Sequence, residues 1–266
     1  MTHEINDHID LLFNSAPENS EQYETDKSIS PDLFRDLNAR FEESKPEEIL
    51  EWGFHHFGKD MVIGTGFGSS GVLLIHRITS NNIPVTVFYL DTHLLYRETY
   101  NLRDELEERF GIEFERVSTQ LSVDDQAEKY GDKLWEKNPD KCCNLRKVLP
   151  LQNYLADKKS WVTGVRRSQA NTRKQTNILE WDPVNRVVKI NPLAKWTNEE
   201  VWDYIQEHDL PYNPLHDHGY PTIGCIPCTE SVDPGESIRS GRWKNNEKIE
   251  CGIHIPTQKF QNGNKL

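Results

Sequence analysis

The sequence has no long apolar segment, little cysteine and no excess of positive charge. No hydrophobic run approaches the roughly 20 residues that a membrane-spanning helix needs. The first ten residues are polar and acidic, and they lack the basic and apolar regions of a signal peptide. We therefore expect a cytoplasmic protein without a membrane partner. The net charge of −12 argues against non-specific nucleic-acid binding.

The composition is that of a folded chain. Of the 266 residues 35% are hydrophobic and 10% aromatic, which is enough apolar material for a substantial core. We divide the chain into a loose N-terminal segment (1–44), a central domain (45–230) and a mobile C-terminal tail (231–266). The sequence is compatible with a homo-oligomer.

Alternating strand and helix patterns predict the central fold. Strands are expected at 60–65, 84–90, 112–117 and 161–163, and the nearly all-apolar run at 84–90 is typical of a strand buried on both faces. Helices are expected at 32–43, 46–58, 72–75, 96–110, 142–156 and 198–208, with a short one at 9–14. Two further short strands are expected at 178–181 and 187–190. This order predicts an α/β fold with a doubly wound parallel sheet. Beyond Leu210, repeated prolines predict loops.

A turn rich in small residues follows the first predicted strand. It comprises Gly66, Phe67, Gly68, Ser69, Ser70 and Gly71, and a predicted helix follows it. Strand, turn and helix in this order point backbone N–H groups and a helix N-terminus at a phosphate. The turn matches neither GxGxxG nor GxxxxGK[ST], so a purely structural turn is the alternative.

The five cysteines form two pairs and a single residue. The pairs are Cys142-Cys143 and Cys225-Ile226-Pro227-Cys228, and the single residue is Cys251. In a cytoplasmic protein such pairs favour metal binding over disulfides. Zinc, an iron–sulfur cluster and free thiols all remain compatible with this spacing. His216 and His218 lie near the second pair, and we expect them to hold the loop.

The motifs together resemble a known family. Cys142 to Lys147, Gly224 to Thr229, and Glu250-Cys251-Gly252-Ile253-His254 are similar to the signatures of assimilatory adenylyl-sulfate reductases. The resemblance covers about residues 45–255. It implies a sheet of the PP-loop adenine-nucleotide hydrolase-like type and a [4Fe–4S] cluster on Cys142, Cys143, Cys225 and Cys228. Ser69-Ser70-Gly71 departs from the acidic residues that the family more often has there.

The resemblance also implies an activity and its residues. Cys251 is the expected nucleophile, which attacks the sulfur of adenylyl sulfate, releases AMP and later yields sulfite. Thioredoxin or glutaredoxin is the expected reductant. The implied substrate-binding residues, beyond those of the glycine-rich turn, are Lys147, Gly164, Arg166, Arg173, Arg239, Arg242 and His254.

Three other functions fit parts of the pattern. The same reaction on the 3′-phosphorylated substrate is the nearest, although relatives specialised for it typically lack the two cysteine pairs. An ATP-using PP-loop transferase would not require Cys251. A zinc-stapled binding protein would carry out no chemistry at all.

Overall fold

The computed structural model describes residues 31–244, 248 and 250–254. The helix expected at 9–14 and the end of the tail, 255–266, lie outside the described residues. The chain forms two compact units, Met1–Glu43 and Ser44–Leu266. Of the first unit, the structure describes one helix, α2 (Pro31–Phe41), where the sequence predicts 32–43.

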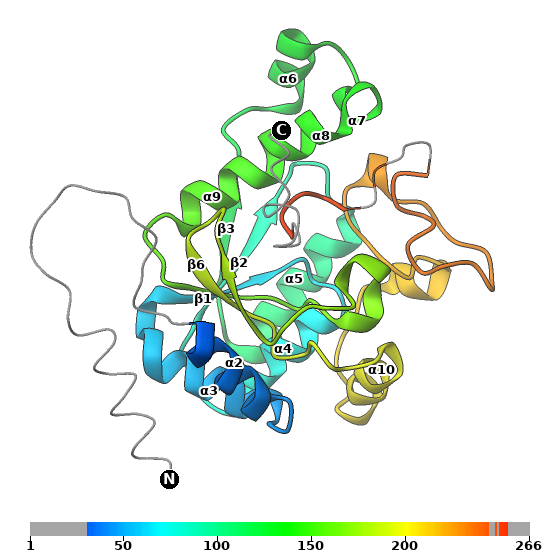
Figure 1. Cartoon of the computed structure of the whole chain (residues 1–266). Coiled ribbons are helices and arrows are strands. Elements are labelled where there is room, and N and C mark those ends of the chain that lie inside the picture. The colour runs from blue at the N-terminus through cyan, green and yellow to red at the C-terminus, as the bar shows by residue number, and fades with distance from the viewer. Residues whose placement is uncertain (1–30, 245–247, 249, 255–266) are drawn as a thin grey trace, which may run out of the picture. The chain divides into compact units, whose positions relative to one another are not determined.

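The second unit is built on a mostly parallel sheet of six strands in the order β3-β2-β1-β4-β6-β5 (Figure 1). The strands are β1 (Met61–Thr65), β2 (Thr86–Asp91), β3 (Phe114–Ser118), β4 (Ser160–Val162), β5 (Leu179–Asp182) and β6 (Val187–Ile190). All pairs are parallel except β5 with β6. These two strands are antiparallel because a tight turn joins them, in which the Asp182 carboxylate accepts hydrogen bonds from Val184 N and Asn185 N. The expected α/β doubly wound fold is confirmed.

Helices cover both faces of this sheet (Figure 1). On one face, Leu151 and Leu155 of α9 (Leu149–Leu155) join a buried cluster with strand residues such as Val62 and Trp161. On the other lie α3 (Pro46–Phe57) and α4 (Ser69–Ser80). Gly53 of α3 lies so close to Met61 and Ile190 that a Cβ there would clash with both side chains. The helices α5 (Arg97–Phe110), closed by left-handed Gly111, and α10 (Asn198–Glu207), capped by Thr197, match the predicted ranges.

The strand order reverses between β1 and β4. The chain leaves β1 toward β2 on one side of the sheet and reaches β4 on the other, so β1 and β4 flank a topological switch point. Open α/β sheets bind their ligands at such a switch point. A Cβ on Gly164, after β4, would lie 2.9 Å from Cβ of Ser70, after β1. The two loops therefore meet at this edge.

The segment that carries the first cysteine pair differs from the prediction. The sequence predicts a helix that starts at Cys142, whereas helix α8 (Pro139–Cys143) begins earlier, because the Asn138 side chain caps Lys141 N and proline follows at the first helical position. A π-helical segment (Asn144–Val148) then leads into α9. Such bulges re-aim side chains and are frequent at functional sites. Two short helices that the sequence did not predict, α6 (Val123–Tyr130) and α7 (Leu134–Lys137), precede α8.

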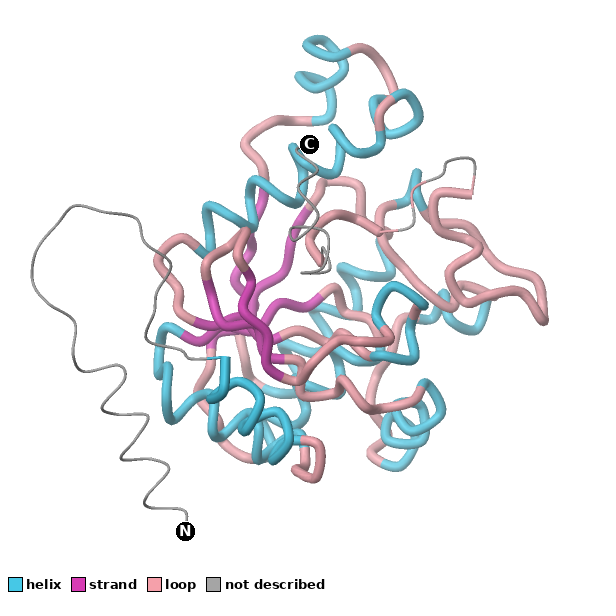
Figure 2. The backbone as a smooth tube through the Cα atoms, viewed as in Figure 1, coloured by secondary structure: helices cyan, strands magenta, loops and turns pink. Residues whose placement is uncertain are grey.

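Loops form most of the chain after α10, as Figure 2 shows. The regular elements described there are single helical turns at Pro214–His218 and Ile226–Cys228. Among the described residues, no helix is long and apolar enough to span a membrane.

Candidate active site at the carboxyl edge of the sheet

The glycine-rich turn lies directly after β1 and leads into α4. Gly68 is the N-cap of α4 without a side-chain cap, and Gly71 N and Val72 N donate to Gly68 O. The Ser70 hydroxyl is buried and has no hydrogen-bond partner within the described part of the chain. A buried hydroxyl and the N–H groups of the first turn of a helix are donors suited to an anion.

Phe67 has a different role from its neighbours. Its side chain is 2% exposed and packs edge-on against Phe114, with a ring-centroid distance of 5.0 Å. Its backbone is left-handed, with φ of 56°, and its N–H donates to Thr65 Oγ1 at 3.0 Å. The Phe67 side chain therefore belongs to the core, and only its backbone can contact a ligand.

The two cysteine pairs come together. Cys142, Cys143, Cys225 and Cys228 line one pocket between α8, α7 and the loop after α10, and Lys147, Trp135 and Trp243 line it with them. The four cysteines are all free thiols. Among the described residues, no three His, Cys, Asp or Glu side chains converge on a point that a single ion would fill. Thiols spaced around a pocket fit a cluster, in which each iron takes one thiolate.

Burial favours the protonated form of Cys142, Cys143 and Cys228. It raises the pKa of Cys143 to about 12 and that of Cys228 to about 11. It also raises the pKa of Cys142, with a further contribution from Cys225. Metal binding must therefore release protons, as thiolate ligation requires.

A hydrogen-bond network that the sequence did not predict supports the pocket. Arg146 is 1% exposed, and it donates to Gln126 Oε1 at 2.8 Å and to Thr92 O at 3.0 Å. The Gln126 amide lies 4.0 Å from Cys142 Sγ, and the Thr92 hydroxyl lies 3.3 Å from Cys225 Sγ. Arg146 thus links one cysteine of each pair through neighbours that contact the sulfur atoms.

The segment that carries Cys251 lies docked against the sheet. His254 stacks on Trp161 of β4 with a centroid distance of 5.3 Å and an interplanar angle of 13°. Ile253 packs against the core cluster beneath α9. Lys248 forms an ion pair with Asp140 of α8. Cys251 is held between these anchors and is half-buried.

Two of the predicted basic residues lie near Cys251 itself. Lys147 and Arg239 are close enough to Cys251 for their charges to interact with a thiolate there. Burial disfavours the charged form of Lys147, whereas thiolates at Cys225, Cys251 and Cys143 favour it, and together these thiolates raise the pKa of Lys147. The ammonium group of Lys147 and the ionised form of these thiols therefore stabilise one another.

Arg173 and Arg239 share one carboxylate, that of Glu250. Arg173 Nε and Nη2 donate to its two oxygens at 2.9 and 2.8 Å, and Arg239 Nη2 donates at 3.1 Å. Arg242 instead donates from Nε to Cys228 O at 3.2 Å and lies 4.6 Å above the Trp243 ring. It therefore braces the loop of the second cysteine pair.

His254 is neutral in this setting. Burial, followed by the charges of Lys189, Arg173, Arg239 and Lys147, holds the pKa of His254 well below its usual value. Its Nδ1 is buried and has no hydrogen-bond partner in the described residues.

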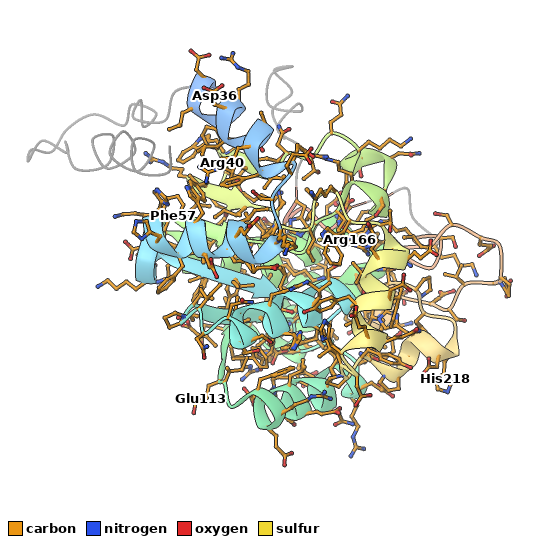
Figure 3. The ribbon with its side chains drawn as sticks, turned by 90° about the horizontal axis from the view of Figure 1, so that it is seen from below. Asp36, Arg40, Phe57, Glu113, Arg166 and His218 are labelled. Carbon is orange, nitrogen blue, oxygen red and sulfur yellow. The ribbon has the colours of Figure 1, made fainter. Side chains whose placement is uncertain are left out.

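Arg166 and the two loop histidines form their hydrogen bonds away from Glu250 and Cys251. Arg166 is 3% exposed and donates to Thr197 O at 2.6 Å and to Asn198 Oδ1 at 3.2 Å, at the start of α10. Burial and then the charge of Arg173 lower the pKa of Arg166 to about 10. Figure 3 shows His218 at the edge of the molecule, away from Arg166. His216 and His218 contact Tyr220 O and Pro214 O within their own loop.

Sequence reasoning missed four residues of this site: Glu250, Lys248, Trp161 and Gln126. Glu250 was quoted only as part of a motif. Its position next to Cys251, among several arginines, was the available signal. Trp161 and Gln126 contact the site from distant parts of the chain, and Lys248, although close to Cys251 in the sequence, pairs with the distant Asp140, so no local pattern marks these contacts.

The comparisons with known proteins agree with this geometry. The model of the phosphoadenosine phosphosulfate reductase domain matches residues 60–231, which include the sheet, the glycine-rich turn and both cysteine pairs. The chain belongs to this family.

The names of individual relatives are more specific than the name of the family. An adenosine 5′-phosphosulfate reductase of Salinibacter ruber is 51% identical over 236 residues, covering 87% of this chain and 94% of the relative. An adenosine 5′-phosphosulfate reductase of Staphylococcus haemolyticus is 44% identical, and the match covers 78% of this chain and 86% of the relative. The resemblance to adenylyl-sulfate reductases is thereby confirmed.

Solved structures show the same fold. A phosphoadenylyl-sulfate reductase from Candida auris, in a phosphate complex, has a TM-score of 0.68 and 30% identity, and the match covers 77% of this chain and 98% of the other. An FMN adenylyltransferase from Candida glabrata, at 15% identity and a TM-score of 0.52, shares only the fold; the match covers 96% of this chain and 90% of the other.

Proposed function

We propose that the protein reduces adenylyl sulfate to sulfite and AMP in sulfate assimilation, with Cys251 as the nucleophile and a dithiol protein of the thioredoxin or glutaredoxin type as the reductant. One observation carries the proposal. Cys251 directly follows Glu250, whose carboxylate binds Arg173 and Arg239, and it lies within electrostatic range of Lys147, at the carboxyl edge of the sheet where this family's fold binds nucleotides.

The first step transfers the sulfuryl group. The Cys251 thiolate attacks the sulfate sulfur, an S–S bond forms, and the S–O bond to the phosphate breaks with its electron pair leaving on AMP. The product on the enzyme is Cys251 S-sulfonate. Lys147 and the nearby arginines offset the negative charge that grows on the departing phosphate. The N–H groups at the start of α4 are further donors for this phosphate.

The second step returns the enzyme to its starting state. A thiolate of the reductant attacks Cys251 Sγ, and sulfite leaves with the electron pair of the S–S bond. The second thiol of the reductant then displaces Cys251 from the mixed disulfide. The two electrons that reduce the sulfur therefore come from one dithiol, which becomes a disulfide.

The donor set of the cysteine pocket fits a [4Fe–4S] cluster held by Cys142, Cys143, Cys225 and Cys228. When bound, the cluster would supply a fixed charge distribution beside Lys147 without relaying electrons. The visible absorbance of anaerobically purified protein, with its iron and sulfide content, distinguishes the cluster from zinc.

Mass spectrometry tests the nucleophile. Protein incubated with adenylyl sulfate and no reductant should carry an added SO₃ on the peptide that contains Cys251, and Cys251→Ser should carry none. An unmodified peptide from fully active protein would refute the proposal.

The 3′-phosphorylated substrate remains the second candidate, because the matching family model and the Candida auris reductase are named for it. The two cysteine pairs favour adenylyl sulfate. Sulfite release measured with each nucleotide at equal concentration decides between the two.

A further inference from the structure

The Glu250 carboxylate occupies a site built for an oxyanion. Arg173 binds both of its oxygens in a fork, and Arg239 and Thr172 donate one further hydrogen bond each, at 3.1 and 3.2 Å. The side chains of Arg173 and Glu250 are 12% exposed, and that of Arg239 is 17% exposed. Water therefore screens these contacts little.

The same guanidinium groups suit a sulfate or phosphate equally well. Arginine presents paired N–H groups whose spacing matches carboxylate and phosphate oxygens alike. Burial raises the pKa of Glu250, but Arg173 and Arg239 outweigh this effect and lower it. Glu250 is consequently an anion at neutral pH, and it holds the position that another anion would need.

We propose that Glu250 is a displaceable internal ligand of the anion site, and that the phosphosulfate group of the substrate takes its place on Arg173 and Arg239. This inference rests on the proposed function, which brings such a group to these arginines. The two arginines then hold either Glu250 or the substrate. Substrate binding therefore releases the residue next to Cys251.

The consequence of this exchange is local. The stacking of His254 on Trp161 and the ion pair of Lys248 with Asp140 do not involve Glu250. They hold the segment on both sides of Cys251 while Glu250 moves. Gly252, with φ of 82°, follows Cys251 directly and allows the backbone to turn there. The nucleophile thus gains freedom to align with the sulfate sulfur only when an anion is bound.

Inorganic sulfate is the probe, and the full-length, anaerobically purified protein is the sample. Glu250→Gln keeps the shape of the side chain and removes its charge. Glu236→Gln, an exposed position in the same C-terminal segment, is the control for the loss of one negative charge. Isothermal titration calorimetry measures sulfate affinity. Hydrogen–deuterium exchange measures the protection of the peptide 248–254.

The exchange model gives definite expectations. Glu250→Gln should bind sulfate about tenfold more tightly, because the competing carboxylate no longer reduces the free fraction of the site. Glu236→Gln should change the affinity less than twofold. Saturating sulfate should lower the protection of 248–254 in the natural protein and leave it unchanged in Glu250→Gln.

Weaker or unchanged sulfate binding in Glu250→Gln would overturn the proposal and indicate that Glu250 positions the two arginines. Protection that does not respond to sulfate would also overturn it. If Glu250→Gln fails to fold, Glu250→Asp replaces it, because the shorter aspartate side chain reaches the arginines less well. Glu250→Asp should show an intermediate gain in sulfate affinity. No gain in affinity would refute the exchange. None of these measurements needs turnover. A protein that releases no sulfite from adenylyl sulfate would refute the proposed function alone.

Discussion

Two glycines at the switch point should respond to alanine in opposite ways. A Cβ at Gly164 would lie 2.9 Å from Ser70 Cβ and 3.6 and 3.7 Å from backbone atoms of α4. Helix backbone cannot yield as a flexible side chain does. At Gly68, in contrast, no described atom lies within 4 Å of an added Cβ, and its φ of −76° suits any residue.

The magnitudes follow from these contacts. Overpacking of a rigid interior costs about 1–3 kcal/mol. For a domain of this size each kcal/mol lowers the melting temperature by about 2–4 °C, so Gly164→Ala should melt about 2–12 °C lower. Gly68→Ala should melt at the temperature of the natural protein or slightly above it, because alanine restricts the unfolded chain.

Ligand binding should distinguish the Gly68 and Gly164 variants further. If a phosphate approaches the backbone at Gly68, a methyl group there should weaken AMP binding by about tenfold, or ~1.4 kcal/mol. Differential scanning fluorimetry and AMP titration of both variants provide the test. A Gly68→Ala protein that binds AMP normally would refute the phosphate site, and a Gly164→Ala protein of full stability would refute the packing argument.

Two further outcomes are expected at the tail. Cys251→Ser should abolish sulfite release and keep nucleotide binding and the visible absorbance, so full turnover in this variant would exclude Cys251 as the nucleophile. Lowering the pH from about 7.5 to about 5.5 should weaken the docking of residues 250–254, because burial and nearby cations depress the pKa of His254. Its contribution to docking is then complete above the unfolded value of about 6.5 and is lost as the pH falls through the folded pKa. Hydrogen–deuterium exchange of residues 250–254, normalised for the intrinsic exchange rate at each pH, measures this change. Protection that does not change with pH, or that changes in the same way in His254→Asn, would contradict the prediction.

The strands and most helices could be predicted because their signals are local. The apolar run of β2, the left-handed glycine that ends α5 and the capping box of Thr197 and Glu200 each lie within a few residues of the element they define. The helices α6 and α7 were missed because they are short and largely polar, so their few apolar residues give no clear period.

The sequence predicts the reactive residues of the site, but it does not predict the residues that position them. Cysteines and arginines stand out in any sequence. Trp161, in contrast, looks like an ordinary strand residue, and only the fold brings His254 onto its ring. In the sequence Arg146 is only a charged residue close to the first cysteine pair, whereas its buried hydrogen bonds give it a structural role. Contacts between segments so far apart leave no mark in a local pattern.

The thiol pocket joins two segments that are far apart in the sequence. Cys142 and Cys143 precede α9, whereas Cys225 and Cys228 lie in the loop-rich region after α10, which hydrogen bonds such as Ile226 N to Leu94 O at 2.8 Å and Tyr96 Oη to Thr229 O at 2.8 Å also fix to the sheet edge. A cluster bound by both pairs would close a loop of about 80 residues, and metal binding of this kind contributes directly to folding.

Loss of the cluster should therefore loosen the chain unevenly. Cys228→Ser, or removal of iron by a chelator, should bleach the visible absorbance and reduce exchange protection at 139–148 and 224–244. The strands β1, β2 and β4 should keep their protection, because their hydrogen bonds and core contacts do not involve the thiols. Ile226→Ala serves as the matched control in the same loop, since its exposed side chain should leave the absorbance intact. If protection fell equally across the sheet, or nowhere, the pocket would not be the element that holds this region in place.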